Sequence, residues 1–113
     1  MTETADVPEI TASALKARLD QGDAPALLDV REHFERRIAD LPDNGQVRIP
    51  TGEIMQRMDE LDRDTSWVIY CRTGSRSAWV VRLLHERGFE KVLNLKGGIM
   101  AWREEVDPTI QAY

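Results

Sequence analysis

The sequence predicts an α/β fold, in which helices cover both faces of a mostly parallel sheet. Three observations support this prediction. Short apolar runs alternate along the chain with segments of helical periodicity, the pattern of parallel strands joined by helices. The run WVIYC (67–71) is apolar throughout, as expected of a central strand buried on both faces. The chain has 113 residues, 42% of them hydrophobic, which suffices for one domain with its own core.

The first predicted elements lie near the N-terminus. Residues 9–22 (EITASALKARLDQG) indicate a short extended piece followed by a helix. The hydroxyl of Thr11 or Ser13 is a suitable N-cap for that helix, and Gly22 is a suitable end. The apolar run PALLDV (25–30) begins with a proline and predicts a short buried strand.

The middle of the chain predicts two further helices around a brief strand. REHFERRIADL (31–41) is typical of a short helix, and PDNGQ (42–46) is a strong turn signal. VRIP (47–50) then predicts a brief strand. In TGEIMQRMDELD (51–62) apolar side chains recur at helical spacing, which indicates an amphipathic helix.

The last third of the chain continues the alternation. After the central strand, SRSAWVVRLLHERG (75–88) indicates a helix with a broad apolar face that stops at Gly88. KVLNL (91–95) predicts another strand, and GGIMAWREEV (97–106) predicts a final short helix.

No internal repeat and no long linker divides the chain. We therefore expect a single domain over residues 1–113. Within it, residues 1–7 are expected to form a flexible N-terminus and residues 103–113 a C-terminal strap.

Charge and composition argue against several classes of function. The net charge of −5 disfavours a general affinity for nucleic acid or for anionic membranes. No apolar stretch reaches membrane-spanning length, and the first ten residues lack the pattern of a signal peptide. One cysteine and two separated histidines do not suggest a structural zinc site, so we expect no metal. A lone cysteine also fits a protein of the reducing cytoplasm.

Polar or glycine-rich residues follow three of the predicted strands. Cys71 ends the central strand, Asp29 lies at the end of the strand at 25–30, and LKGG (95–98) completes the last strand and continues beyond it. In α/β sheets of this kind, ligands bind beyond the carboxyl ends of the strands. The sequence therefore predicts a site at this edge of the sheet.

The loop after Cys71 has the features of an anion cradle. Cys71 precedes a helix N-terminus and is flanked by Arg72 and Arg76, which favours the ionised, nucleophilic form of a thiol. Gly74 permits a sharp turn that points backbone amides inward. The alternative interpretation is a buried strand cysteine beside solvated arginines, but the coincidence of these features favours a reactive cysteine.

The chain resembles the family of single-domain rhodaneses over nearly its whole length. The matching stretches are LLDVRE (27–32), RIPTGEI (48–54), VIYCRTGSRS (68–77) and LLHERGFEKVLNLKGGIMAW (83–102), together with their spacing. The resemblance implies a single rhodanese-like domain, whose five-stranded, mostly parallel sheet has helices on both faces. It also implies a rhodanese-type sulfurtransferase, and it implies no metal or organic cofactor.

The same resemblance assigns the site residues. Cys71 is implied to be the catalytic residue, which carries the transferred sulfur as a persulfide. The loop that follows is implied to cradle the substrate through Arg72, Thr73, Gly74, Ser75, Arg76 and Ser77. Asp29 and Arg31 are implied to hold that loop through hydrogen bonds, from a second layer around the site.

Two segments set this chain apart from the common rhodanese pattern. Many rhodaneses carry Gly-His-Ile-Pro-Gly before the strand at 47–50, whereas here residues 36–50 read RRIADLPDNGQVRIP, so the pocket should differ on that side. The tail AWREEVDPTIQAY (101–113) resembles the end of rhodanese domains fused to sulfur-carrier adenylyltransferases, although a strap over apolar surface explains it equally well. The first interpretation implies a small sulfur carrier protein as the acceptor.

The sequence thus predicts transfer of sulfane sulfur from thiosulfate or a persulfide donor to a nucleophilic acceptor through Cys71. Two alternatives stay open. One is a Cys-dependent phosphatase or arsenate reductase. Rhodanese-like phosphatases have five residues between cysteine and arginine, whereas four separate Cys71 from Arg76, and this shorter loop is too tight for phosphate. A non-enzymatic protein-binding module could share the fold, although inactive members typically lack the cysteine.

Overall fold

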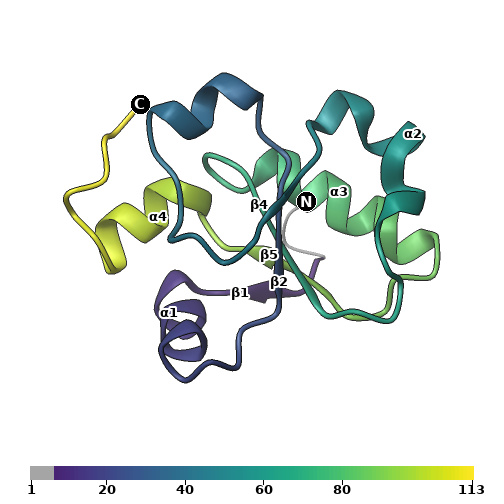
Figure 1. Cartoon of the computed structure of the whole chain (residues 1–113), viewed down its shortest axis with the longest axis horizontal. Helices are drawn as coiled ribbons and strands as arrows, with labels where there is room; N and C mark the ends of the chain where they lie inside the picture. The colour runs from purple at the N-terminus through teal and green to yellow at the C-terminus, as the bar shows by residue number, and fades with distance from the viewer. Residues whose placement is uncertain (1–6) are drawn as a thin grey trace.

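The sheet is parallel throughout, and its strand order places β4 in the middle. Helices lie to either side of it (Figure 1). The computed structural model describes residues 7–113, and in that part of the chain five strands pair in the order β1-β5-β4-β2-β3. The strands are β1 (Glu9–Ile10), β2 (Ala26–Asp29), β3 (Val47–Arg48), β4 (Trp67–Tyr70) and β5 (Val92–Leu95). The expected five-stranded sheet is confirmed, and every pairing in it is parallel.

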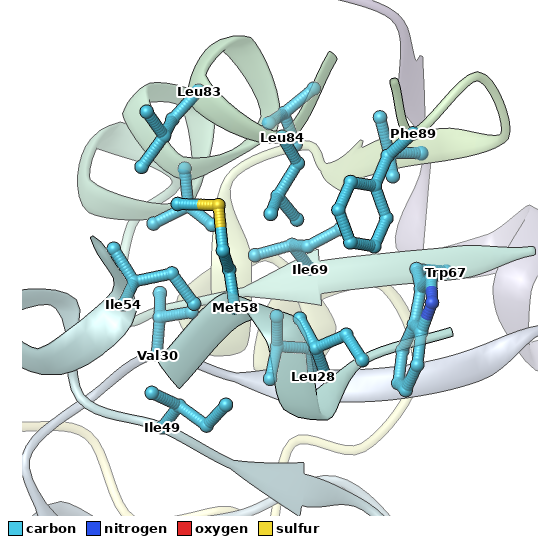
Figure 2. Packing of buried hydrophobic residues seen from close by; sticks show 14 of the residues in the cluster. Leu28, Val30, Ile49, Ile54, Met58, Trp67, Ile69, Leu83, Leu84 and Phe89 are labelled. Atoms are coloured by element: carbon cyan, nitrogen blue, oxygen red, sulfur yellow. The ribbon is translucent and has the colours of Figure 1, made fainter. Parts of the chain in front are cut away.

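Helices cover both faces of this sheet, as predicted, and each face has its own hydrophobic cluster. The α-helices of the described residues are α1 (Ala12–Asp20), α2 (Ile54–Arg57), α3 (Ser75–Glu86) and α4 (Gly98–Glu105). Ile69 of β4 and Leu84 of α3 are fully buried in the first cluster, which joins the sheet to α2 and α3 (Figure 2). The next residue back along β4, Val68, points to the opposite face and packs in the second cluster with Trp102 of α4.

Two expected helices are shorter or more broken than their sequence patterns predict. Of residues 31–41, only η2 (His33–Arg37) is helical, as a 3-10 turn. An α-helix does not continue there because Ala39 gives its carbonyl to Arg31, and Pro42 has no amide hydrogen to donate. The segment 51–62 forms three short pieces: η3 (Thr51–Glu53), α2 and η4 (Met58–Glu60).

The described part of the chain begins at Val7 and ends at Tyr113. Residues 1–6 of the expected flexible N-terminus lie outside the described residues, and Val7 is buried in the first hydrophobic cluster. At the other end, α4 takes up the first residues of the expected strap. The remainder runs back along the molecule, and Ile110 and Tyr113 pack against the second cluster. None of the helices in residues 7–113 is long and apolar enough to cross a membrane.

Candidate functional site

Cys71 directly follows the central strand, and backbone amides surround its sulfur. The residue is 1% exposed. Its Sγ accepts hydrogen bonds from the amide of Gly74 at 3.1 Å and from the amide of Ser77 at 3.4 Å. Both donors belong to the turn into α3 or to its first turn, where amides have no partner within the helix. Two backbone amides therefore face the sulfur of Cys71.

Gly74 makes the tight turn possible for two reasons. Its φ of +103° is a conformation that L side chains rarely adopt. A Cβ placed there would also approach the backbone nitrogen of Gly97 to 3.2 Å. The loop is therefore packed against the segment that follows β5, as expected of strand ends that meet at one edge of a sheet.

The N-terminus of α4 fixes the start of the cysteine loop. The amide of Ile99 donates to the carbonyl of Cys71, and the amide of Met100 donates to the carbonyl of Arg72, both at 3.0 Å. Gly98 packs directly against these two carbonyls. A Cβ on Gly98 would lie 2.5 Å from the carbonyl oxygens of Cys71 and Arg72. The backbones of α4 and of the cysteine loop therefore come into close contact at Gly98.

Arg76 is held by a carboxylate that the sequence analysis did not single out. Its Nη1 and Nη2 donate to the two oxygens of Glu35 at 2.8 and 3.1 Å. The hydrogen bonds to Glu35 raise the pKa of Arg76. Burial would raise the pKa of Glu35, but hydrogen bonds from Arg76, the Glu32 amide and the Tyr113 hydroxyl lower it to about 2. The pair therefore stays fully charged at neutral pH, and Glu35 offsets much of the charge of Arg76.

Arg72 is the more accessible of the two loop arginines. Its side chain is exposed, and its guanidinium lies 5.3 Å from the centre of the Tyr113 ring. Tyr113 therefore joins the C-terminal strap to the cysteine loop. Thr73 and Ser75, the other polar side chains of the turn, are also exposed.

Asp29, the last residue of β2, forms a buried ion pair with Arg31. Arg31 donates from Nε and Nη2 to the two oxygens of Asp29 at 2.9 and 3.0 Å. Burial would lower the pKa of Arg31, but the interactions with Asp29 and Tyr113 raise it. Arg31 donates to the hydroxyl of Tyr113, which in turn donates to Glu35. Within residues 7–113, the pair thus connects to Arg76 of the loop through Tyr113 and Glu35.

An aspartate holds the segment whose sequence departs from the rhodanese pattern. Asp40 accepts hydrogen bonds from Arg31 at 3.1 Å, from Arg48 at 2.7 Å and from the hydroxyl of Tyr70 at 2.8 Å. Burial, followed by the charges of Asp29 and Asp40, raises the pKa of Tyr70, so that phenol stays protonated. Arginine–carboxylate contacts therefore fix residues 39–40 beside the site.

The loop borders an open pocket of about 310 Å³ on the side that faces β1 and β5. Its walls are Glu9, Thr73, Gly74, Ser75, Asn94 and Gly97. Within residues 7–113, no group of three His, Cys, Asp or Glu side chains is placed to hold a metal ion. The arrangement offers amide donors to a negatively charged sulfur.

Glu35 and Asn94 are among the residues that contact this site without having been expected from the sequence. Glu35 lies in a run of alternating charges, HFERR, which carries no signal that one carboxylate is buried. Asn94 is a lone polar residue in the apolar run VLNL, and such a residue near a strand end could have been singled out.

Comparison with known proteins shows what the chain is similar to. The family described as "Rhodanese-like domain" matches residues 11–105. "Putative sulfurtransferase YtwF" of Bacillus subtilis is 38% identical over 103 residues, 91% of this chain and 97% of that protein. "Probable adenylyltransferase/sulfurtransferase MoeZ" of Mycobacterium tuberculosis is 35% identical over 106 residues, which cover 92% of this chain but 26% of that protein.

A solved structure shows the same architecture. The crystal structure of a rhodanese-related protein from Thermoplasma volcanium superposes with a TM-score of 0.78 at 31% sequence identity. The superposition covers 88% of this chain and 93% of that protein.

Proposed function

The chain belongs to the rhodanese-like domain family, and from this membership we propose that it is a sulfurtransferase that carries sulfane sulfur on Cys71 as a persulfide. One observation carries the proposal: the single cysteine directly follows the central strand, with two backbone amides donating to its sulfur. Amide donors stabilise negative charge on sulfur both before and after transfer.

The reaction has two halves. The Cys71 thiolate attacks the sulfane sulfur of thiosulfate or of a persulfide donor. A new S–S bond forms to Sγ while the bond to the donor breaks, so sulfite or the donor's thiolate leaves with the electron pair. In the second half, a nucleophilic acceptor attacks the outer sulfur and releases the Cys71 thiolate. No second cysteine is present to resolve the persulfide within the chain, so the sulfur passes to another molecule.

The loop residues take different roles in this scheme. The amides of the 72–77 turn cradle the outer, negatively charged sulfur. Arg72, which is exposed, meets the anionic donor and the leaving group. Arg76 chiefly positions the loop, because its charge is paired with Glu35. Thr73 and Ser75 offer hydroxyl donors at the rim, and Asp29 and Arg31 hold the segments behind it.

We propose a small sulfur carrier protein as one acceptor. MoeZ is named a probable adenylyltransferase/sulfurtransferase, and this chain matches about a quarter of its length. We assign the reaction to the reducing cytoplasm, where a lone thiol stays free to cycle.

Two other functions are less well supported. Phosphate or arsenate chemistry would require more room than the four residues between Cys71 and Arg76 provide. A binding module without activity would have no need of amide donors aimed at a thiol. The retained cysteine and its cradle therefore favour sulfur transfer.

Intact mass spectrometry tests the proposal. After incubation with thiosulfate, and without reductant, the native protein should gain the mass of one sulfur atom. Cyanide should remove that sulfur and yield thiocyanate, and Cys71→Ser should show neither step, because a neutral hydroxyl is a poor nucleophile for sulfur. If thiosulfate and persulfide donors all fail to load the native chain, the binding-module function becomes the better one. Robust hydrolysis of an aryl phosphate would instead support the phosphatase alternative.

A further inference from the structure

Two buried polar side chains lie behind the thiol and take no part in the steps above. They are Ser77 in the first turn of α3 and Asn94 on β5, which are 0% and 1% exposed. The inference drawn from them rests on the proposed function, since it concerns the proton that Cys71 loses before sulfur transfer.

The carbonyl of Gly74 fixes the orientation of the Asn94 side chain. A carbonyl can only accept, so the Asn94 atom 3.1 Å from it is the donor Nδ2. The other end of the amide, Oδ1, then lies 2.5 Å from Oγ of Ser77. Because Oδ1 can only accept, the hydroxyl proton of Ser77 lies between these two oxygens.

Oγ of Ser77 also lies 3.3 Å from Sγ of Cys71. A hydroxyl has one proton, which cannot be donated to Asn94 and to the sulfur at the same time. With that proton directed at Asn94, Oγ presents a lone pair to the sulfur. A protonated thiol can donate its S–H to this lone pair, whereas a thiolate would be repelled by it and would keep only the two amide donors.

We propose that Asn94 is a positioning residue that acts through Ser77 to stabilise the protonated thiol of Cys71 in the unloaded site. Loading with thiosulfate releases the thiol proton to solvent, forms the S–S bond and expels sulfite. The negative charge then resides on the outer sulfur, in the amide cradle, and Sγ faces the lone pair of Ser77 without charge. The pair therefore disfavours the free thiolate more than it disfavours the persulfide.

The charged groups around the thiol stay the same in all variants of the test. They come from the loop itself, from α3, from η2 and from β1. These groups are Arg72, Arg76, Glu35 and Glu9, and the titratable phenol of Tyr113 in the strap is retained as well. Every variant keeps these groups. Their own titration therefore affects all of the thiol titration curves alike and does not account for a difference between variants.

The experiment measures the pH at which the single thiol is half ionised, from the 13Cβ resonance of labelled cysteine. We compare the native chain with Ser77→Ala, Asn94→Ala and the double variant. Ser77→Ala should lower this pH by about one unit, because it removes both the acceptor for the thiol and the lone pair that repels the thiolate. Asn94→Ala should lower it at least as far, because the freed hydroxyl can then donate to the thiolate.

The double variant tests whether Asn94 acts through Ser77. Once Ser77 is alanine, the Asn94 change should add nothing to the shift. A hydroxyl that donates to the thiolate would give the opposite sign, so a rise or no change in Ser77→Ala overturns the proposal. If Asn94→Ala shifts the half-ionisation pH of the thiol as far in the Ser77→Ala background as in the native chain, the proposal is overturned as well.

If Asn94→Ala fails to fold by circular dichroism, the sign of the Ser77→Ala shift still decides. The titration needs no sulfur donor, so its outcome is separate from that of persulfide formation. A chain that titrates as expected but never gains sulfur would contradict the proposed function alone.

Discussion

Glu35 shows how one residue can bind three parts of the site together. Its carboxylate accepts hydrogen bonds from Arg76, from Tyr113 and from the amide of Glu32. These contacts join the start of α3, the C-terminal strap and η2. Because Glu35 is only 4% exposed, water does not readily replace them.

The charge of Glu35 should make stability depend on pH in acid. The pKa of Glu35 is about 2 in the folded protein, against an ordinary value of 4.5. The unfolded chain therefore binds the proton first, and the stabilisation is complete above pH 4.5 and is lost as the pH falls towards 2. The difference corresponds to about 3 kcal/mol.

Urea denaturation at several pH values, with Glu35→Gln as the comparison, measures this contribution. Glu35→Gln should be less stable than the native chain at pH 7, and the gap should close by about 3 kcal/mol as the pH falls to 2. Other carboxylates titrate in both proteins, so the difference isolates Glu35. A gap that does not change with pH would contradict this assignment.

At the scale of elements, the contact between α4 and the cysteine loop depends on one glycine. Gly98 has a φ of +61°, and a Cβ there would approach backbone atoms of Cys71 and Arg72 to about 2.5 Å. Backbone atoms cannot move aside as a flexible side chain can. The N-terminus of α4 could then no longer donate to both carbonyls of the loop.

Gly98→Ala should therefore lower the free energy of unfolding by more than the strain of a positive φ alone would. Gly45 is a matched control, because its φ is +69° but nothing lies within 4 Å of its Cβ position. Gly45→Ala should lose about 1–2 kcal/mol of unfolding free energy, and Gly98→Ala at least about 3 kcal/mol. Urea denaturation measures both, and equal losses would show that the loop and α4 are not in tight contact.

At the scale of the whole molecule, the sheet separates two hydrophobic clusters that both support the site. The first cluster anchors α3, whose first turn supplies amides to the thiol, and the second anchors α4. Leu84 of α3 is fully buried in the first cluster (Figure 2). Met55 of α2 is 58% exposed and offers a contrast on the same side of the sheet.

Leu84→Ala should lower the free energy of unfolding by about 2–5 kcal/mol, because it leaves a cavity between α3 and the sheet. Met55→Ala should change it by less than about 0.5 kcal/mol. Denaturant midpoints at a constant m-value measure both changes. Similar effects of the two substitutions would contradict the packing described for this face.

The order of elements and the position of the thiol follow from the sequence by itself. WVIYC is apolar at every position because β4 is buried on both faces, and the turn chemistry of CRTGSR directly follows it. Such features depend on neighbours within a few residues, so local periodicity and a glycine suffice to predict them. The sequence could not show that the expected helix at 31–41 stops after one 3-10 turn. It stops there because the side chain of Arg31 donates a hydrogen bond to the carbonyl of Ala39.

Only the tertiary structure decided which polar side chains meet around the sulfur. Glu35 and Arg76 are 41 residues apart, Glu35 and Tyr113 are 78 apart, and Ser77 and Asn94 are 17 apart. Their contacts depend on the strand order and on the path of the strap, which no pattern within one segment encodes. The sequence therefore determined that a thiol lies in an amide turn at the edge of a parallel sheet. The packing of distant segments determined that Glu35 neutralises one arginine and that Asn94 directs the hydroxyl beside the sulfur, because burial leaves each polar group only the partners that the fold brings within reach.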